Sequence, residues 1–423
     1  MRKYNPGILW LRSGGNKPEY YPFHIYLRKG EVLELVGQWD QALAIYRELL
    51  NQSELAKESA CLAQSWINLG WLFHKQGDED QALQLLSKAG DYYRGKSDQG
   101  CFGGVLNKIG NIYSRQGENG KALEHFTLSL ELATDRKDRY NISIAMNNIG
   151  NTYGDIGDYH KALEYYQKSH DLDVTAGDYL SASIDMGNMG WVYLAIGDYA
   201  KARNCWEKQI SWAEKFGYKH SLSIALGNMA ALHIMQGEYQ KGLSGIHIRL
   251  KIAGEMGDKK GLSVSYSHLG SIHLVNREYG QAIEAYDRAI GLAREIGLKY
   301  YLTMFLQEAG EAHFELGEYA KAEKLCRESL EIAQSINKKD TIFKCHLLQA
   351  KLAGIKDKEE GIRLIGELLA EAEQPALQAV VNFELFKLAN DEQCRKKALE
   401  IYSRLYEKTP DIDYKKKMEE LTS

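Results

Sequence analysis

The segment SIAMNNIGNTYGDIGDYHKALEYYQKSHDLDVTAGDYLSA, residues 143–182, decides the fold of this 423-residue chain. Met146, Ile149 and Tyr153 follow one another at intervals of three and four residues, which is typical of one face of a helix. Gly157 and Asp158 then favour a turn. A second amphipathic pattern follows that turn: Ala162, Leu163, Tyr166 and Leu172. The segment therefore predicts two helices joined by a tight turn.

This pattern recurs every forty residues. One position of the repeat holds glycine, with Ala230 replacing it in one copy: Gly30, Gly70, Gly110, Gly150, Gly190, Gly270 and Gly310. Twelve residues further on, a second position is also small: Ala42, Ala82, Ala122, Ala162, Ala202, Gly242, Ala282 and Ala322. Two such series in register indicate a solenoid, in which each repeat buries its apolar face against its neighbours.

The repeats divide the chain. Eight forty-residue repeats account for residues 23–342, residues 343–378 form a degenerate ninth repeat, and residues 379–412 match a 34-residue repeat. We expect an irregular N-terminal extension at residues 1–22 and a polar capping segment at residues 413–423. Residues 23–374 contain no proline, as long runs of uninterrupted helix require.

Composition narrows the possible functions. The net charge of −4 gives no basic excess, so we expect neither nucleic-acid nor membrane binding. The six cysteines include no CxxC pair and indicate free thiols, and no stretch reaches the length of a secretory leader or a membrane helix. The expected location is cytoplasmic.

The repeat resembles the tetratricopeptide repeat (TPR). Residues of two successive copies fit its consensus: Trp66, Leu69, Gly70, Phe73, Ala82 and Ala89, then Leu106, Gly110, Tyr113, Ala122 and Phe126. The forty-residue length is similar to repeats of Pins/LGN-type scaffolds and kinesin light chains. The resemblance implies an all-α solenoid, a right-handed superhelix of helix-turn-helix repeats whose first helices line a concave face.

Asparagines recur at the non-core positions of the expected first helices: Asn68, Asn107, Asn111, Asn147, Asn148, Asn151, Asn188 and Asn228. Asparagine is a poor residue for a helix interior, so its repetition calls for a reason. An amide offers both a donor and an acceptor to the backbone of an extended peptide, and the resemblance implies this use. The alternative is a ladder of amides that bond neighbouring repeats to one another.

Other side chains extend the predicted binding face. Trp71 and Trp191 are candidate aromatic anchors, and Lys108 and Arg115 give the N-terminal part of the face a positive charge. The alternative for the two charged residues is that they belong to an ordinary solvated surface, and the alternative for the two tryptophans is that they pack in the core. Three histidines recur once per repeat and are expected to replace tyrosine in the core: His233, His273 and His313.

No phosphate loop, nucleophile elbow or zinc-protease motif is present, so we expect no catalysis, metal or cofactor. The sequence favours a non-catalytic scaffold that binds a peptide or a partner-protein segment in the concave groove. Two alternatives stay open: a ligand- or peptide-gated bacterial regulator, and a regulatory or sensor subunit of a larger enzyme complex. The sequence leaves the oligomeric state open.

Overall fold

The computed structural model describes residues 10–12, 20–35, 38–96 and 98–422, and it is almost entirely helical. The chain divides into two compact units, an N-terminal unit (Met1–Asn188) and a C-terminal unit (Met189–Ser423). The division falls within helix α9 (Tyr179–Ala195). None of the helices in the described part of the chain combines the length and apolar character needed to span a membrane.

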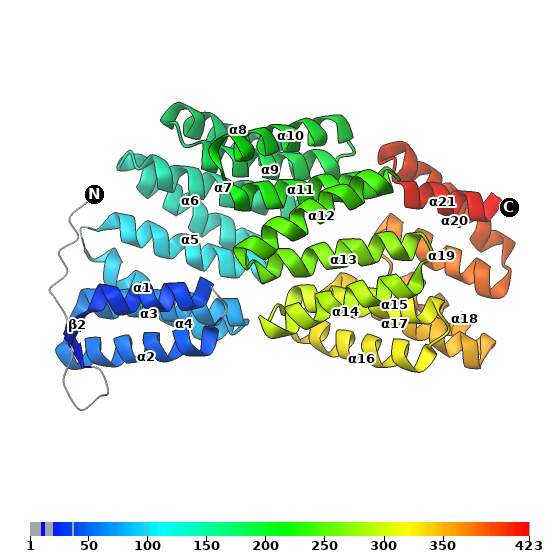
Figure 1. Cartoon of the computed structure of the whole chain (residues 1–423), viewed down its shortest axis with the longest axis horizontal. Helices are drawn as coiled ribbons and strands as arrows, with labels where there is room; N and C mark the ends of the chain where they lie inside the picture. The colour runs from blue at the N-terminus through cyan, green and yellow to red at the C-terminus, as the bar shows by residue number, and fades with distance from the viewer. Residues whose placement is uncertain (1–9, 13–19, 36–37, 97, 423) are drawn as a thin grey trace. The chain divides into compact units, whose positions relative to one another are not determined.

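The N-terminal unit begins with a short antiparallel ribbon. Strand β1 (Trp10–Arg12) pairs with β2 (Tyr20–Pro22), with Leu11 opposite Tyr21. Eight helices follow as successive antiparallel pairs (Figure 1): α1 (Phe23–Leu35), α2 (Trp39–Ala56), α3 (Ser59–Gln76), α4 (Glu79–Arg94), α5 (Gln99–Arg115), α6 (Asn119–Asp135), α7 (Arg139–Ile156) and α8 (Tyr159–Ala176).

The C-terminal unit continues the same alternation beyond α9. Its helices are α10 (Tyr199–Phe216), α11 (Lys219–Met235), α12 (Tyr239–Met256), α13 (Lys259–Val275), α14 (Tyr279–Glu295), α15 (Lys299–Glu315), α16 (Tyr319–Ser335), α17 (Lys339–Lys356), α18 (Lys358–Glu371), α19 (Pro375–Ala389), α20 (Glu392–Lys408) and α21 (Ile412–Thr422). The expected all-α solenoid is thus confirmed.

The turn between the two helices of a repeat requires a left-handed residue. Gly157 ends α7 with φ 87°, and its N–H donates to Gly154 O. Asp158 then caps α8 by accepting from the backbone N–H of Lys161. Glycine tolerates positive φ without steric cost, and an aspartate at the N-cap satisfies a free backbone donor. These two residues fix the sharp reversal that the sequence predicts.

The glycine series makes room for a ring on the second helix. A Cβ on Gly150 would lie 2.7 Å from Cε1 of Tyr166, sixteen residues later, and one on Gly110 would lie 2.5 Å from Cε1 of Phe126. In the copy that holds Ala230 in place of glycine, the residue sixteen positions later is Ile246, whose side chain is smaller than a tyrosine or phenylalanine ring. The small position therefore accommodates a large buried side chain between the paired helices.

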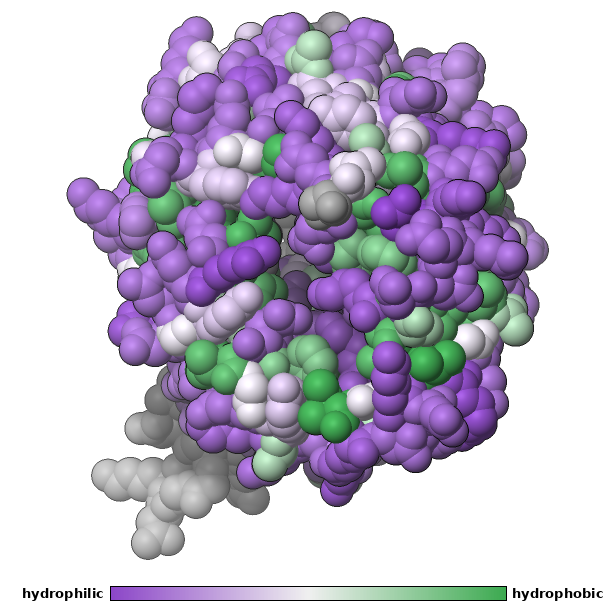
Figure 2. Space-filling model, turned by 90° about the vertical axis from the view of Figure 1, so that its right-hand side faces the viewer, coloured by the Kyte–Doolittle hydropathy of each residue, from purple (hydrophilic) through white to green (hydrophobic). Residues whose placement is uncertain are grey.

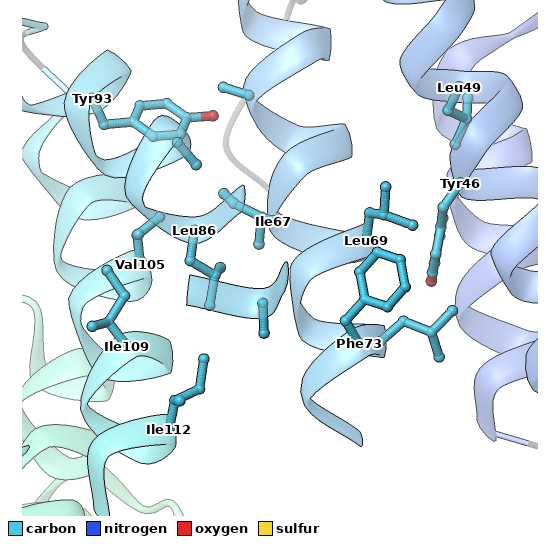
Figure 3. Packing of buried hydrophobic residues seen from close by; sticks show 14 of the residues in the cluster. Tyr46, Leu49, Ile67, Leu69, Phe73, Leu86, Tyr93, Val105, Ile109 and Ile112 are labelled. Carbon is cyan, nitrogen blue, oxygen red and sulfur yellow. The ribbon is translucent and has the colours of Figure 1, made fainter. Parts of the chain in front are cut away.

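Hydrophobic side chains from successive helices form one continuous core cluster in the N-terminal unit. Figure 3 shows Tyr46 of α2, Phe73 of α3, Leu86 of α4 and Ile109 of α5 in this cluster, all of them buried. Each repeat contributes residues to contacts with both neighbours, as expected for a solenoid. The repeat stack holds the first helices in fixed register.

The last helix also makes contacts across the C-terminal unit that nearest-neighbour stacking does not require. Lys416 Nζ of α21 donates to Tyr239 Oη at the start of α12, 177 residues away in sequence, at 3.1 Å. Gly237, in the turn before α12, lies against Ile412, whose Cγ1 would be 3.0 Å from an added Cβ. The C-terminal segment therefore does more than cap the last repeat.

Candidate functional site

The first helices of successive repeats contact one another directly and so form an inner layer. In the N-terminal unit α3 contacts α5 and α5 contacts α7, and in the C-terminal unit α11, α13, α15 and α17 are joined in the same way. Side chains that are 40 or 41 residues apart consequently lie next to each other. We call the surface of this layer the inner face; in the N-terminal unit it comprises Asn68, Trp71, Lys108, Asn111, Asn148, Asn151 and Asn188.

Two pairs of predicted amides bond to each other between repeats. Asn188 Nδ2 donates to Asn147 Oδ1 at 2.7 Å, and Asn148 Nδ2 lies 3.4 Å from Asn107 Oδ1. Asn107 is buried, whereas Asn148 and Asn188 are half-buried. Part of the asparagine series therefore forms the intramolecular ladder that was the alternative interpretation, with Asn148 and Asn188 on its more exposed side.

A buried polar network supports this ladder. Asn147 Nδ2 also donates to Asp185 Oδ1 and lies 3.2 Å from Ser169 Oγ, and Ser143 Oγ donates to Asp173 Oδ2 at 2.7 Å. Asp185 has no exposed surface, and its second oxygen has no hydrogen-bond partner. Burial raises the pKa of Asp185 to about 8, and it also raises the pKa of Asp173.

The remaining amides of the N-terminal unit differ in how far they are engaged. Asn68 Oδ1 accepts from Gln64 Nε2 at 2.8 Å, and Asn151 Oδ1 accepts from Tyr166 Oη at 2.6 Å. Asn111 is half-buried, and its amide forms no hydrogen bond with any residue that the structure describes. Asn111 thus keeps its full donor and acceptor capacity for another molecule.

A cationic site lies beside these amides. Lys108 Nζ lies 4.2 Å from the centre of the Trp71 ring, a cation–π geometry. Burial lowers the pKa of Lys108 to about 8; the charge of Glu34 opposes this shift and that of Lys75 adds to it. Glu34 itself pairs with Lys75. Lys108 has no ion-pair partner among the described residues.

Arg115 is largely engaged within the fold. Its Nη1 donates to His74 O at 2.8 Å, and its Nε lies 3.5 Å from Glu79 Oε1. His74 in turn lies 2.7 Å from Glu79 through Nδ1. Arg115 therefore ties α5 to the preceding turn, and it is 42% exposed as a side chain.

The two predicted residues in the C-terminal unit lie together. The indole of Trp191 is 47% exposed and packs edge-on against Trp206, with ring centres 5.7 Å apart. In the amide orientation that satisfies both indoles, Asn228 Oδ1 accepts from Nε1 of Trp191 and of Trp206 at 3.3 Å each. Asn228 is buried, so it positions the exposed Trp191 ring.

The repeated histidines have a role that the sequence did not reveal. His233, His273 and His313 each place Nδ1 within 2.5–2.6 Å of the glutamate five residues later: Glu238, Glu278 and Glu318. Each pair connects the end of a first helix to the following turn. Only His313 is buried. The prediction that these histidines replace tyrosine in the core therefore misses the His–Glu hydrogen bond. The recurring spacing of five residues between histidine and glutamate was the signal in the sequence that could have predicted this bond.

A large cavity, which the sequence analysis does not predict, lies in the C-terminal unit. It has a volume of about 1070 Å³ and is lined by α15, α17, α19 and α21. Acidic Glu311 on α15 is paired there with Lys351 on α17 at 3.0 Å. Figure 2 shows small, separate hydrophobic patches among mostly hydrophilic side chains on the face it presents.

Comparisons with known proteins agree with this architecture. Models of the tetratricopeptide repeat match residues 22–94, 103–173, 186–216 and 268–335, more than half of the chain. No curated protein matches the sequence significantly.

Three solved structures have a similar fold at low sequence identity. NprR in complex with its cognate peptide NprX is 16% identical, with a TM-score of 0.54 over 81% of this chain and 96% of that one. Aspartyl phosphate phosphatase F from Bacillus subtilis is 14% identical, with a TM-score of 0.52 over 69% of this chain and 75% of that one. A Rap protein complexed with competence and sporulation factor is 15% identical, with a TM-score of 0.50 over 75% of this chain and 98% of that one.

Proposed function

Because the chain belongs to the tetratricopeptide repeat family, we propose that it is a protein-interaction scaffold whose inner face binds an extended segment of a partner protein. The observation that carries this proposal is the group of available polar side chains beside an aromatic ring on α3, α5 and α7. Asn111 has an unengaged amide, Asn148 has only a long hydrogen bond, and Lys108 lies over Trp71.

The chemistry of these groups defines the segment. Asparagine amides donate to backbone carbonyls and accept from backbone N–H groups, so they recognise an extended chain whatever its side chains. Lys108 is an unpaired, half-buried cation and favours an acidic side chain. Trp71 offers an apolar surface next to that charge. The partner segment is therefore extended, and it is acidic where it passes α5.

The internally bonded amides have a supporting role. Asn107 and Asn147 link adjacent first helices through Asn148 and Asn188 and thereby hold the spacing between repeats. A binding face that is fixed before the ligand arrives loses less conformational entropy on binding. Asn68 and Asn151 on the inner face, and Arg115 at the end of α5, have one internal contact or more each. Trp191, positioned by Asn228, provides a separate contact in the C-terminal unit.

A peptide-gated regulator is the second candidate. It is favoured by the similar folds of NprR, solved in complex with its cognate peptide, and of a Rap protein, solved in complex with competence and sporulation factor. Both candidates require peptide binding, and they differ in its consequence. Small-angle X-ray scattering with and without a bound peptide separates them, because only a regulator of this kind must change conformation.

The binding proposal is tested by selecting peptides from a random displayed library on the wild-type protein and measuring their affinity for variants. Asn111→Ala combined with Asn148→Ala should weaken the selected peptides roughly five- to a hundredfold, since each neutral hydrogen bond contributes about 0.5–1.5 kcal/mol. Asn51→Ala, at an exposed position of α2, is the control and should leave the affinity unchanged. Equal binding by the double variant would place the interaction elsewhere.

A further inference from the structure

Arg249 is a buried arginine without a counterion. It lies on α12 with 8% of its surface exposed, and its Nε has no hydrogen-bond partner. Its guanidinium forms no ion pair or hydrogen bond with any residue that the structure describes, and burial lowers its pKa. An isolated buried charge is costly unless it is paired. The arrangement therefore indicates a partner from outside the chain.

The guanidinium occupies the space above a glycine of the inner layer. A Cβ on Gly227 of α11 would lie 2.6 Å from Arg249 Nη1, so the absence of a side chain at residue 227 is what admits the arginine. The charge of Arg249 also helps to lower the pKa of His268 of α13, whose buried Nδ1 has no hydrogen-bond partner either. Two buried nitrogens without a partner, Arg249 Nε and His268 Nδ1, thus lie on consecutive helices, α12 and α13.

The equivalent positions of another repeat hold different polar groups. Two sets of residues, 80 positions apart in sequence, occupy equivalent positions of their repeats: Asn147, Ser169, Asp185 and Asn188 in the N-terminal unit, and Gly227, Arg249, Ser265 and His268 in the C-terminal unit. In the first set the buried carboxyl group of Asp185 accepts from Asn147. In the second set the equivalent residue is Ser265, whose hydroxyl donates to Gly261 O at 2.7 Å.

No nearby carboxylate of the described chain replaces Asp185 in the second set. Asp258 acts on Arg249 only through its charge, because its carboxylate accepts from the backbone N–H of Gly261 at 2.8 Å and caps α13. The second set therefore has a buried cation and no carboxyl group at the position equivalent to Asp185. A guanidinium matches a carboxylate through two parallel N–H···O bonds.

We propose that Arg249 and His268 bind the carboxylate group of a ligand, which takes the place that Asp185 occupies in the equivalent network. His268 contributes as a neutral donor: burial lowers its pKa to about 4, with the charge of Arg249 adding to the effect. The carboxylate comes from a small organic acid or from a peptide. This site is in the C-terminal unit and does not depend on the binding face proposed for the N-terminal unit.

The test uses acetate, N-acetylglycine and the neutral N-acetylglycinamide as probes, at constant ionic strength. The first readout is the ¹⁵N–¹H resonance of Arg249 Nε, assigned by its disappearance in Arg249→Lys. The second is thermal unfolding, because a ligand that binds only the folded state raises the unfolding temperature. Both acids should shift the resonance and raise this temperature, and the amide should do neither. A stronger effect of N-acetylglycine than of acetate would indicate a peptide terminus as the source.

Two variants make the result specific. Ser265→Asp places a carboxylate where Asp185 stands in the other network, so it should raise the unfolding temperature and abolish the response to acetate. Ser244→Asp adds the same charge at an exposed position of α12 and should keep that response. Arg249→Met should lose the response to acetate. The proposal is overturned if neither acid shifts the resonance, if the amide acts as strongly as the acids, or if Arg249→Met still responds.

Discussion

The side-chain amide of Asn188 donates to Oδ1 of Asn147 at 2.7 Å, across 41 residues of sequence and two adjacent first helices. The bond joins residues that the sequence presents only as members of a repeated series. It distinguishes asparagines that hold the repeats together from asparagines that are available to a ligand. This distinction can be measured.

Asn188→Ala should destabilise the protein by about 0.5–1.5 kcal/mol, because it leaves Asn147 Oδ1 without its donor. Asn111→Ala should be neutral or slightly stabilising, since alanine has the higher helix propensity and the Asn111 amide has no internal partner to lose. Urea unfolding followed by circular dichroism measures both. Equal destabilisation by the two substitutions would contradict the assignment of Asn147 and Asn188 to a structural ladder.

The free energy of unfolding should fall as the pH rises from 6 to 8, because Asp185 is protonated in the folded state. The pKa of this carboxyl group is raised from an unfolded value near 4 to about 8 in the folded state. Over this interval the folded state holds the proton and the unfolded state has lost it, so unfolding becomes easier by at most about 1.4 kcal/mol per pH unit.

Asp185→Asn removes this titration and keeps a neutral side chain of similar shape. The difference in unfolding free energy between pH 6 and pH 8 should therefore be smaller in the variant than in the wild type. Comparing the two proteins cancels the contribution of histidines elsewhere. An unchanged pH dependence would show that Asp185 is ionised in the folded state at neutral pH.

Gly190→Ala should cost roughly 1–3 kcal/mol, because its methyl group would lie 2.6 Å from Cε2 of the buried Trp206 indole. The matched control is Gly291→Ala in α14, where no atom lies within 4 Å of the added carbon. That change should stabilise by about 0.5–1 kcal/mol through helix propensity. Hydrogen exchange should show the Gly190→Ala effect in α9, α10 and their neighbours, and a uniform effect along the chain would argue against nearest-neighbour packing.

Lys108 should make the binding of an acidic peptide pH-dependent. Its pKa of about 8 means that the ammonium is charged at pH 7 and loses its proton as the pH rises to 9. Peptides selected on the wild type should therefore bind more weakly at pH 9 than at pH 7, as measured by fluorescence anisotropy. Lys108→Arg keeps the charge and should remove most of this dependence. Equal affinities of the wild type at the two pH values would remove Lys108 from the binding site.

The local features of the fold were predictable because they depend on residues close together in sequence. Gly157 and Asp158 specify a turn through the backbone conformation of one residue and the capping bond of the other. The forty-residue period then implies the stacking of like units. The resemblance to the tetratricopeptide repeat also identified the first helices as the layer to examine, and the asparagines recur at the non-core positions of these helices.

The state of each candidate side chain was not predictable to the same extent. Asn111 and Asn147 have the same residue type on the same kind of helix, yet one amide is unengaged and the other makes three hydrogen bonds. The difference comes from Ser169, Asp185 and Asn188, which are brought to Asn147 by the packing of two other helices, α8 and α9. Asp185 did carry a signal, namely a carboxylate at a repeat position that is otherwise small, apolar or hydroxylated.

The sequence by itself determined the repeat, its turns and the helical solenoid, because helix periodicity, glycine conformation and capping act over a few residues. Only the tertiary structure decided which polar groups meet. It pairs Asn147 with Asn188, leaves Arg249 without an anion, and brings Lys416 to Tyr239 across 177 residues. Such contacts depend on the position of whole helices, and small changes in packing decide whether a buried polar group finds its partner.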